Sequence, residues 1–321
     1  MRPLLLTGAN GFVGKILTGR LQQAGFHVTA LSGQSSPAQS TADDHLQCDI
    51  RDTEALASAV ARVRPEYVVH LAAVSHVPTS FKNPLLTWQT NVMGSMNLLE
   101  AIKQHAPEAF VLFPSSSEVY GAAFKTADSV DENTPPQPLN PYAASKVAAE
   151  TAFREYFRQG VKGVKGVIAR PFNHIGAQQS ADFVTASFAR QIALIEAGKQ
   201  APVLKVGNLD AIRDFLDVQD VCSAYLELLK LTDTPGHPVC LNVASGHSRR
   251  IRDMLDQLLA LSTAHIDVEL DPERLRPSDI PVAVGNARLL RETTGWQPQI
   301  ALQDTLRELL DYWRQQVLHS A

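Results

Sequence analysis

The chain has 321 residues, of which 45% are apolar and 19% are charged, and its net charge is −4 at neutral pH. This composition is ordinary for a globular protein, and the lack of a Lys/Arg-rich run argues against electrostatic binding of nucleic acid. Three cysteines have neither metal-ligand nor disulfide spacing, so we expect no metal and a reduced, cytoplasmic chain. We expect no signal peptide before Gly8 and no membrane span, because the apolar runs are too short.

Short apolar segments alternate with longer amphipathic ones in the first half. Strands are predicted at 3–6, 27–31, 67–72, 110–115 and 164–169, and helices at 12–24, 52–63, 83–104 and 141–158. This order predicts an α/β fold, a doubly wound parallel Rossmann sheet with helices on both faces. Beyond Pro171 the alternation loosens, with helices predicted at 183–197, 218–231 and 251–261. We predict a dinucleotide-binding domain over 1–171, with a returning segment near 205–235, and a smaller α/β substrate lobe over 172–321.

The segment LLLTGANGFVG connects the first strand to the first helix. Gly8, Gly11 and Gly14 permit a tight turn and let backbone N–H groups approach a diphosphate. The N-terminus of the helix adds a favourable positive potential. The G-x-x-G-x-x-G spacing, placed between a strand and a helix, therefore predicts dinucleotide binding.

The second strand ends in VTALSGQ, which bears on the choice of dinucleotide. It has no acidic residue to accept hydrogen bonds from the ribose of NAD, and no nearby arginine to hold the 2′-phosphate of NADP. Both NADPH and NADH therefore stay open, with a slight preference for NADP. Asp49 in CDIRD is a candidate partner for the adenine amino group, or else an acid at a helix N-terminus.

The segment NPYAASKVAAE places Tyr142 and Lys146 four residues apart, on one face of a helix. An ammonium group beside a phenol lowers the phenol's pKa from about 10, and such a tyrosine can exchange a proton with an alcohol or ketone oxygen. The strand end FPSSSEVYG offers hydroxyls at 115–117 that could hold the same oxygen. Asn91, within the long helix, could order a backbone kink or a water chain.

Taken in this order, the motifs resemble those of the extended short-chain dehydrogenase/reductases. The matching segments, over essentially the whole chain, are TGANGFVG, CDIRD, HLAA, TNVMGSMNLLEA, SSSEVYG, PYAASK and RPFNHIG. The resemblance implies that Ser116 is the catalytic hydroxyl, Tyr142 the acid/base and Lys146 the residue that binds the nicotinamide ribose, with Asn91 in support. It also implies cofactor contacts from Tyr142, Lys146, Gly8, Asn10, Gly11, Phe12, Val13, Gly14, Asp49, Ile50, Leu71, Ala72 and Ala73. Related proteins form homodimers through the helices that carry Asn91 and Tyr142, so we expect a homodimer.

The second half resembles the GDP-mannose branch of these enzymes, which comprises 4,6-dehydratases and 4-ketohexose reductases. The segments that carry this likeness are VGNLDAIRDFLDVQDV and RPSDIPVAVGNARLLRETTGWQP. The resemblance implies a GDP-sugar substrate held by Ser117, Asn173, Lys205, Arg213, Arg276 and Asp279. A planar guanidinium suits a diphosphate, although Arg213-Asp214 could also be a local surface ion pair. We expect Asp214 to orient Arg213 rather than to touch the ligand.

Glu118 keeps a second reaction open, because it stands where the dehydratases carry the base that removes the C5 proton. Against dehydration, the catalytic hydroxyl is a serine rather than a threonine, the opening loop lacks the TGxxGQDG-like pattern, and Pro281 replaces an aspartate. The chain also departs from the reductases at 177–178, where PGQ is usual. The resemblance favours reduction of GDP-4-dehydro-6-deoxy-D-mannose to GDP-D-rhamnose. The alternatives are a GDP-mannose 4,6-dehydratase, a reductase that forms GDP-6-deoxy-D-talose, and a non-catalytic NAD(P)-sensing protein.

Overall fold

The computed structural model describes residues 1–33, 41–127, 129–158, 164–275 and 280–319. Its larger part is a seven-stranded, all-parallel sheet with the strand order β10-β6-β5-β4-β1-β2-β3. The predicted α/β fold is confirmed. The strands are β1 (Arg2–Thr7), β2 (Phe26–Ser32), β3 (Asp44–Gln47), β4 (Tyr67–His70), β5 (Phe110–Pro114), β6 (Lys165–Pro171) and β10 (Cys240–Val243).

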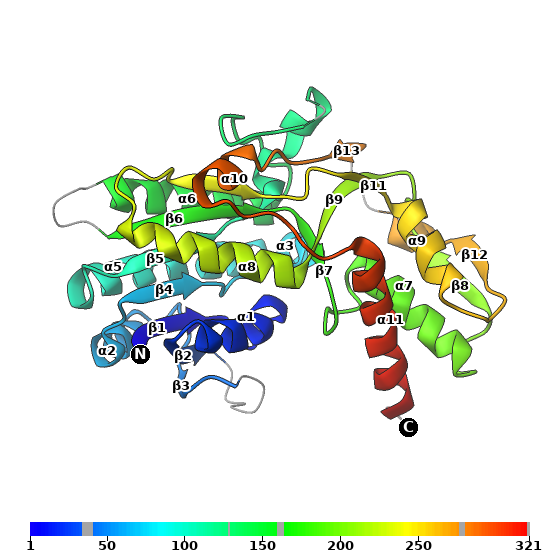
Figure 1. The fold of residues 1–321 in the computed structure, drawn as a ribbon, viewed down its shortest axis with the longest axis horizontal. Helices are drawn as coiled ribbons and strands as arrows, with labels where there is room; N and C mark the ends of the chain where they lie inside the picture. Colours follow the sequence, from blue (N-terminus) through cyan, green and yellow to red (C-terminus); the bar gives the residue numbers. More distant parts are fainter. Residues whose placement is uncertain (34–40, 128, 159–163, 276–279, 320–321) are drawn as a thin grey trace.

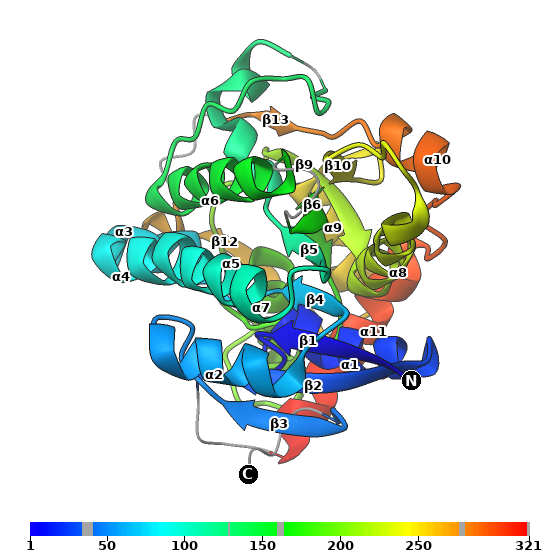
Figure 2. The ribbon, with the colours of Figure 1, turned by 90° about the vertical axis from the view of Figure 1, so that its left-hand side faces the viewer.

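Helices cover both faces of this sheet (Figure 2). One face carries α2 (Thr53–Val63), α5 (Gly94–His105) and α6 (Pro141–Arg158), and the other carries α1 (Phe12–Gln23), α8 (Val218–Leu229) and α10 (Arg288–Thr294). Successive residues of β1 point to opposite faces, so Leu4 and Leu6 join one hydrophobic core while Leu5 joins the other. A strand buried on both sides needs apolar residues throughout, which explains the run LLL.

A smaller part lies to the right in Figure 1. It contains a four-stranded sheet formed by β7 (Asn173–Ile175), β9 (Ile212–Asp217), β11 (Ser248–Arg250) and β13 (Val282–Ala283). A two-stranded parallel sheet, β8 (Val203–Val206) with β12 (Asp267–Leu270), lies beside it. A separate hydrophobic core is enclosed by α7 (Val184–Glu196), α9 (Ile251–Ala260) and α11 (Leu302–His319).

The chain passes between the two parts more than once. After β7, α7, β8 and β9 it returns as α8 and β10 to the large sheet, and it then runs through β11, α9, β12 and β13 before α10 packs against the large-sheet core. Within the segment 205–235 it is α8 that lies on the large sheet, whereas β8 and β9 lie in the smaller sheets. The domain boundaries themselves stay a prediction.

The long helix predicted at 83–104 is interrupted. It consists of α4 (Pro84–Trp88), a π-helical turn at Gln89–Met93 and α5, and α3 (Val77–Lys82) precedes it. Single π-turns inside helices often occur at functional sites, and this one holds the buried Asn91. Short 3₁₀ helices lie at Ser117–Lys125, Lys230–Asp233 and Pro272–Arg274. Among the described helices, none has the length and apolar character required to cross a membrane.

Candidate active site

The glycine loop between β1 and α1 has the shape that a diphosphate requires. Gly8 has φ +71°, and the N–H of Gly11 donates to its carbonyl over 3.0 Å. A Cβ on Gly14 would lie 2.4 Å from the Gly8 oxygen, and a Cβ on Gly8 would lie 2.7 Å from the Ala72 nitrogen. Gly11 caps α1 without a side chain, so no side-chain oxygen at the cap competes with a bound phosphate. The loop therefore fits NAD(P).

Other predicted cofactor residues converge on the same edge of the sheet. The N–H groups of Leu71 and Ala72 donate to the carbonyl and to the hydroxyl of Thr7, over 3.2 and 3.1 Å. The rings of Phe12 and His174 are stacked, with centroids 6.1 Å apart, so the start of α1 touches the substrate lobe at β7. Asn10 lies in the loop turn, Ala73 directly follows Ala72, and Val13 packs on the core beneath. Binding sites in doubly wound sheets lie at this carboxyl edge.

The adenosine end of the expected site contains an ion pair that sequence reasoning missed. The Asp49 carboxylate accepts two hydrogen bonds from Arg51 Nε, at 3.0 Å each, and one from Arg51 Nη2 at 2.5 Å. A Cβ on Gly33, at the end of β2, would lie 3.8 Å from Asp49 Cα. Asp49 therefore follows β3 in sequence but lies beside the end of β2 in space, and it holds the Arg51 guanidinium. Ile50 is buried against Gly94 of α5.

The three residues expected to perform catalysis are brought together. Ser116 follows β5, and Tyr142 and Lys146 lie on α6, all three buried. Burial raises the pKa of Tyr142 to about 12; a hydrogen bond with Ser116 acts to lower this pKa, and the charge of Glu118 acts to raise it. The net pKa of Tyr142 is thus raised rather than lowered, because burial of the phenol dominates; the effect of Lys146 on this pKa stays a prediction.

The ammonium group of Lys146 is directed at the sheet. Its Nζ donates to the Pro114 carbonyl over 2.8 Å and lies 4.7 Å from the centroid of the Phe113 ring. Burial lowers the pKa of Lys146 to about 8, while the charge of Glu150 acts to raise it.

Asn91 supports the tyrosine through the backbone. Its Oδ1 accepts from the Val74 N–H over 2.8 Å, and its Nδ2 donates to the Ser145 hydroxyl over 2.9 Å. The same serine hydroxyl donates to the Tyr142 carbonyl over 2.7 Å. The Ser80 hydroxyl, on α3, accepts from the Tyr142 N–H over 3.2 Å. Ser80 was not predicted, because its distance of 62 residues along the chain gives no local signal.

Glu118 lies beside this catalytic group. Its Oε2 accepts from Asn140 Nδ2 over 3.0 Å, and its charge influences both Tyr142 and Arg213. Arg213 Nη1 donates to the carbonyls of Ile212 (2.8 Å) and Pro281 (3.5 Å). Burial lowers the pKa of Arg213, and Glu118 acts to raise it. The arginine of the segment KVGNLDAIRD is thus close enough to Glu118, which lies beside the catalytic residues, to interact with its charge.

Asp214, the next residue, has a different role from the one predicted. Its fully buried carboxylate accepts from the Ser245 N–H and hydroxyl and from the N–H groups of Gly246 and Gly285, over 2.6–3.2 Å. Successive side chains of a strand point to opposite faces, so Asp214 faces away from Arg213 on β9. The expectation that Asp214 orients Arg213 was wrong.

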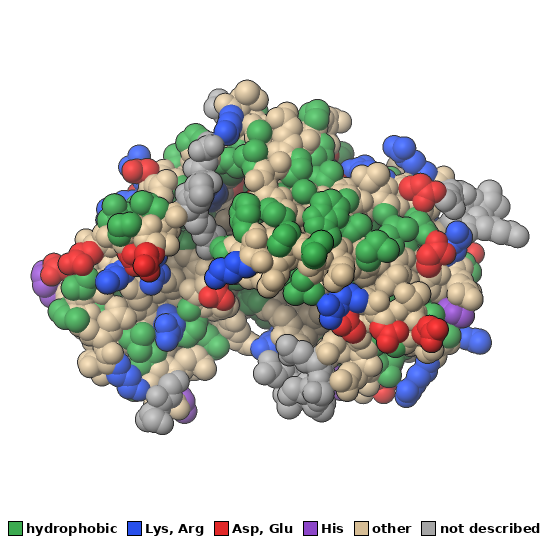
Figure 3. All heavy atoms as spheres, turned by 180° about the vertical axis from the view of Figure 1, so that it is seen from behind, with side chains coloured by type: hydrophobic (Ala, Val, Ile, Leu, Met, Phe, Trp, Pro, Cys, Tyr) green, Lys and Arg blue, Asp and Glu red, His purple; other side chains and the backbone are tan. Residues whose placement is uncertain are grey.

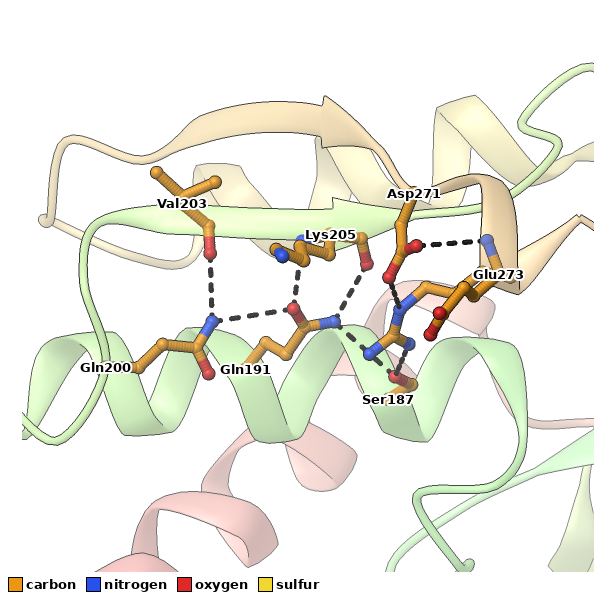
Figure 4. Close-up of polar contacts among 8 residues, drawn as sticks. Ser187, Gln191, Gln200, Val203, Lys205, Asp271 and Glu273 are labelled. Atoms are coloured by element: carbon orange, nitrogen blue, oxygen red, sulfur yellow. Dashed lines mark hydrogen bonds and ion pairs between the residues drawn. The ribbon is translucent and has the colours of Figure 1, made fainter.

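The remaining substrate residues are distributed over several elements. Lys205 is exposed on β8, where Gln191 of α7 fixes its backbone N–H and carbonyl over 2.9 and 3.1 Å (Figure 4). A Cβ on Gly207 would lie 2.5 Å from the Arg274 carbonyl, so glycine lets these two segments meet. Asn173 is exposed at the start of β7, and Ser117 is buried at the start of the 3₁₀ helix. Arg276 and Asp279 lie outside the described residues.

A family model described as GDP-mannose 4,6 dehydratase matches residues 5–309. The chain belongs to this family. Such membership confirms the resemblance to the extended short-chain dehydrogenase/reductases. It also confirms the coarse class predicted for the chain, an NAD(P)-dependent enzyme that modifies a GDP-sugar.

Within the GDP-mannose 4,6-dehydratase family, relatives with different activities are similar to this chain. It is 38% identical over 315 residues to the GDP-6-deoxy-D-mannose reductase of Pseudomonas aeruginosa, covering 98% of each chain. It is 26% identical over 358 residues to a GDP-mannose 4,6-dehydratase of Yersinia enterocolitica, covering 97% of this chain and 93% of that protein. The structure of RMD from Pseudomonas aeruginosa complexed with NADPH is similar at a TM-score of 0.85 and 35% identity, covering 98% of this chain and 100% of that one.

Proposed function

We propose that this protein reduces the 4-keto group of GDP-4-dehydro-6-deoxy-D-mannose with NAD(P)H and forms GDP-D-rhamnose. The observation that supports this proposal most directly is the state of Tyr142. This tyrosine is buried and hydrogen-bonds with Ser116, and its pKa of about 12 keeps the phenol protonated. A reductase needs a proton donor at this point, whereas an enzyme that begins by oxidising C4 needs a base. The greater identity to a reductase, 38% against 26% for a dehydratase, supports the same choice.

The proposed reaction adds a hydride and a proton across the C4 carbonyl. The reduced nicotinamide, when bound, supplies the hydride to C4. Tyr142 donates its phenolic proton to the C4 oxygen, and the Ser116 hydroxyl donates a hydrogen bond to that oxygen. Lys146 holds the nicotinamide ribose, and its positive charge stabilises the phenolate left after the transfer until solvent reprotonates it. The phosphate loop and residues 71–73, which follow β4 at the carboxyl edge of the large sheet, hold the rest of the dinucleotide.

NADPH is the favoured cofactor in this proposal. The pairing of Arg51 with Asp49 beside the end of β2 supports it, because a guanidinium at that end can bind a 2′-phosphate. The related RMD structure was solved with NADPH. NADH stays an alternative, since a related UDP-glucose 4-epimerase of Thermus thermophilus, with a TM-score of 0.83 and 28% identity, was solved with NAD.

We assign the GDP part of the substrate to the smaller lobe. Arg213, half-buried and near Glu118, is the first candidate for a phosphate contact. Asn173, Lys205, Arg276 and Asp279 are proposed as further contacts to GDP, and Ser117 as a contact to the sugar.

One observation favours a second candidate function. Glu118 stands within electrostatic reach of Tyr142, where a dehydratase would place its C5 base. GDP-mannose 4,6-dehydratase therefore remains the alternative to test. A reductase that forms GDP-6-deoxy-D-talose would differ only in the face of C4 that receives the hydride. The complete set of Ser116, Tyr142 and Lys146 argues against a non-catalytic NAD(P)-sensing protein.

A homodimer and a cytoplasmic location belong to the same proposal. Phe81, Leu85, Trp88 and Met93, on α3, α4 and the π-turn, are 42–77% exposed. Both helices lie on the side of the molecule shown in Figure 3, where apolar side chains gather. The three cysteines are buried and free, which supports a reducing compartment.

The deciding experiment mixes the protein with GDP-4-dehydro-6-deoxy-D-mannose and either NADPH or NADH, and follows the loss of absorbance of the reduced nicotinamide. We expect oxidation of the cofactor, and an NMR spectrum of the product distinguishes rhamnose from talose. No oxidation with either cofactor would refute the reductase. Conversion of GDP-mannose without added cofactor would establish the dehydratase. Tyr142→Phe is expected to abolish turnover and to leave NADPH binding intact.

A further inference from the structure

Asn140 makes more contacts than a helix cap requires. It precedes Pro141, the first residue of α6, and its Oδ1 accepts from the Ala143 N–H over 2.8 Å. Serine would fill this capping role equally well. The amide adds a donor, Nδ2, which serine lacks and which lies 3.0 Å from Glu118 Oε2. The second contact therefore needs an explanation beyond capping.

The contact closes a ring through the catalytic residues. The N–H of Glu118 donates to the Ser116 hydroxyl over 3.2 Å, and Glu118 is held in turn by Asn140. Asn140 stands two residues before Tyr142, whose phenol hydrogen-bonds with Ser116. Each member of the ring thus fixes the next, and the ring joins the end of β5 to the first turn of α6.

We propose that Asn140 is a positioning residue for the reduction: its Nδ2 fixes the Glu118 carboxylate beside Tyr142 and thereby holds the phenol against Ser116. This inference rests on the proposed function. The fixed negative charge favours the protonated phenol, which is the form that a reductase uses. A carboxylate tied to Asn140 is also restrained from reaching toward substrate as a mobile base.

Other charged and titratable groups act on the same phenol or near it. Lys146 lies one turn further along α6, and Arg213 of β9 interacts with Glu118. Tyr225 of α8 is also within electrostatic reach of Tyr142. The positive charge of Lys146 favours the phenolate form of Tyr142, whereas the negative charge of Glu118 favours the protonated form.

Three variants separate the hydrogen bond between Asn140 and Glu118 from the capping of α6 by Asn140. Asn140→Ser keeps an oxygen for the Ala143 N–H but cannot reach Glu118, and Glu118→Ala removes the other partner. We expect each variant to lower kcat roughly tenfold to a hundredfold, because misplaced catalytic groups cost about that much. The KM for NADPH should stay within about twofold. The double variant should be no slower than either single variant, because both remove one interaction.

A substrate-free titration completes the test. The ultraviolet absorbance of tyrosinate is followed with pH in the wild type and in Asn140→Ser, and each curve is corrected with the matching Tyr142→Phe protein. We expect Tyr142 to lose its proton at lower pH in Asn140→Ser. Wild-type kcat together with an unchanged titration, or additive effects of the two single variants, would overturn the inference. If the wild type has no reductase activity, the proposed function fails, and the titration alone decides the role of Asn140.

Discussion

The Asp214 carboxylate lies 2.6 Å from the Ser245 hydroxyl and also accepts three backbone N–H groups. We expect Asp214→Ala to lower the free energy of unfolding by about 3 kcal/mol or more, because it leaves buried donors without an acceptor. Chemical denaturation measures this change. Asp210→Ala is the matched control, since this exposed acid lies in the same segment and should change stability by less than about 0.5 kcal/mol. Equal stability of the two variants would contradict the assigned role.

The fold of the first half could be predicted because local pattern and tertiary structure agree there. A continuous apolar run such as LLL that ends in a glycine turn indicates a strand buried on both faces, and the glycine spacing indicates a close approach of backbone segments. In the second half, the pattern of apolar residues at 183–197 likewise predicts a helix, and the structure contains α7 at Val184–Glu196.

The site was less predictable where contacts join distant segments. Ser80 and Ser116 reach Tyr142 from 62 and 26 residues away, and of these Ser116 had a motif to identify it. The Asn-Pro pair at 140–141 is a helix-start signal that could have identified the cap, but not its bond to Glu118. The role of Asp214 was missed because Arg213 and Asp214 are adjacent in sequence, which suggests an ion pair. In the strand β9 their side chains point to opposite faces.

The two glycines of α1, Gly14 beside the phosphate loop and Gly19 further along the helix, differ sharply in the space around them. A Cβ on Gly14 would meet backbone atoms at 2.4–2.8 Å, whereas Gly19, on the same helix, has nothing within 4 Å. Gly14→Ala should therefore weaken NADPH binding at least about tenfold, as the loop must shift. Gly19→Ala should leave binding unchanged and stabilise the helix by up to about 1 kcal/mol. Fluorescence titration with NADPH measures the affinities, and a Gly14→Ala protein with wild-type affinity would refute the proposed diphosphate site.

Lys146 should make stability depend on alkaline pH. Its pKa is about 8 in the folded protein and 10.5 in the reference state, so between these values the unfolded chain binds a proton that the folded chain has lost. Stability contributed by this group therefore rises as the pH rises from 8 to 10.5, by about 3 kcal/mol in total. We expect the free energy of unfolding of the wild type to rise relative to that of Lys146→Met over this window. Denaturation of both proteins at several pH values, without added cofactor, measures the difference, and a constant difference would contradict the prediction.

Arg213 and Lys205 should differ in importance for the substrate. Arg213 is half-buried and close to Glu118, whereas Lys205 is exposed on a separate two-stranded sheet. We expect Arg213→Ala to raise the KM for the sugar nucleotide at least about tenfold, as loss of a charge-assisted hydrogen bond of 1.5–3 kcal/mol would do. Lys205→Ala should raise it less, and neither variant should change the Kd for NADPH. Initial rates over a range of substrate concentrations check this, and a larger effect at Lys205 would reverse the assignment.

The apolar face on α3 and α4 should hold two copies of the chain together. Leu85 on α4 is 77% exposed, and Met93, in the π-turn that also holds Asn91, is 56% exposed. Exposed apolar residues that gather in this way mark interaction surfaces. Burying them in a two-fold interface would remove apolar surface from water on both copies. We expect the wild type to sediment with the mass of two chains or more, and the double variant Leu85→Asp/Met93→Asp with the mass of one. Leu270→Asp, at a leucine of β12 that is 62% exposed, is the control and should keep the wild-type mass. A wild type that sediments as a single chain, or a control that dissociates equally, would exclude this face as the dimer interface.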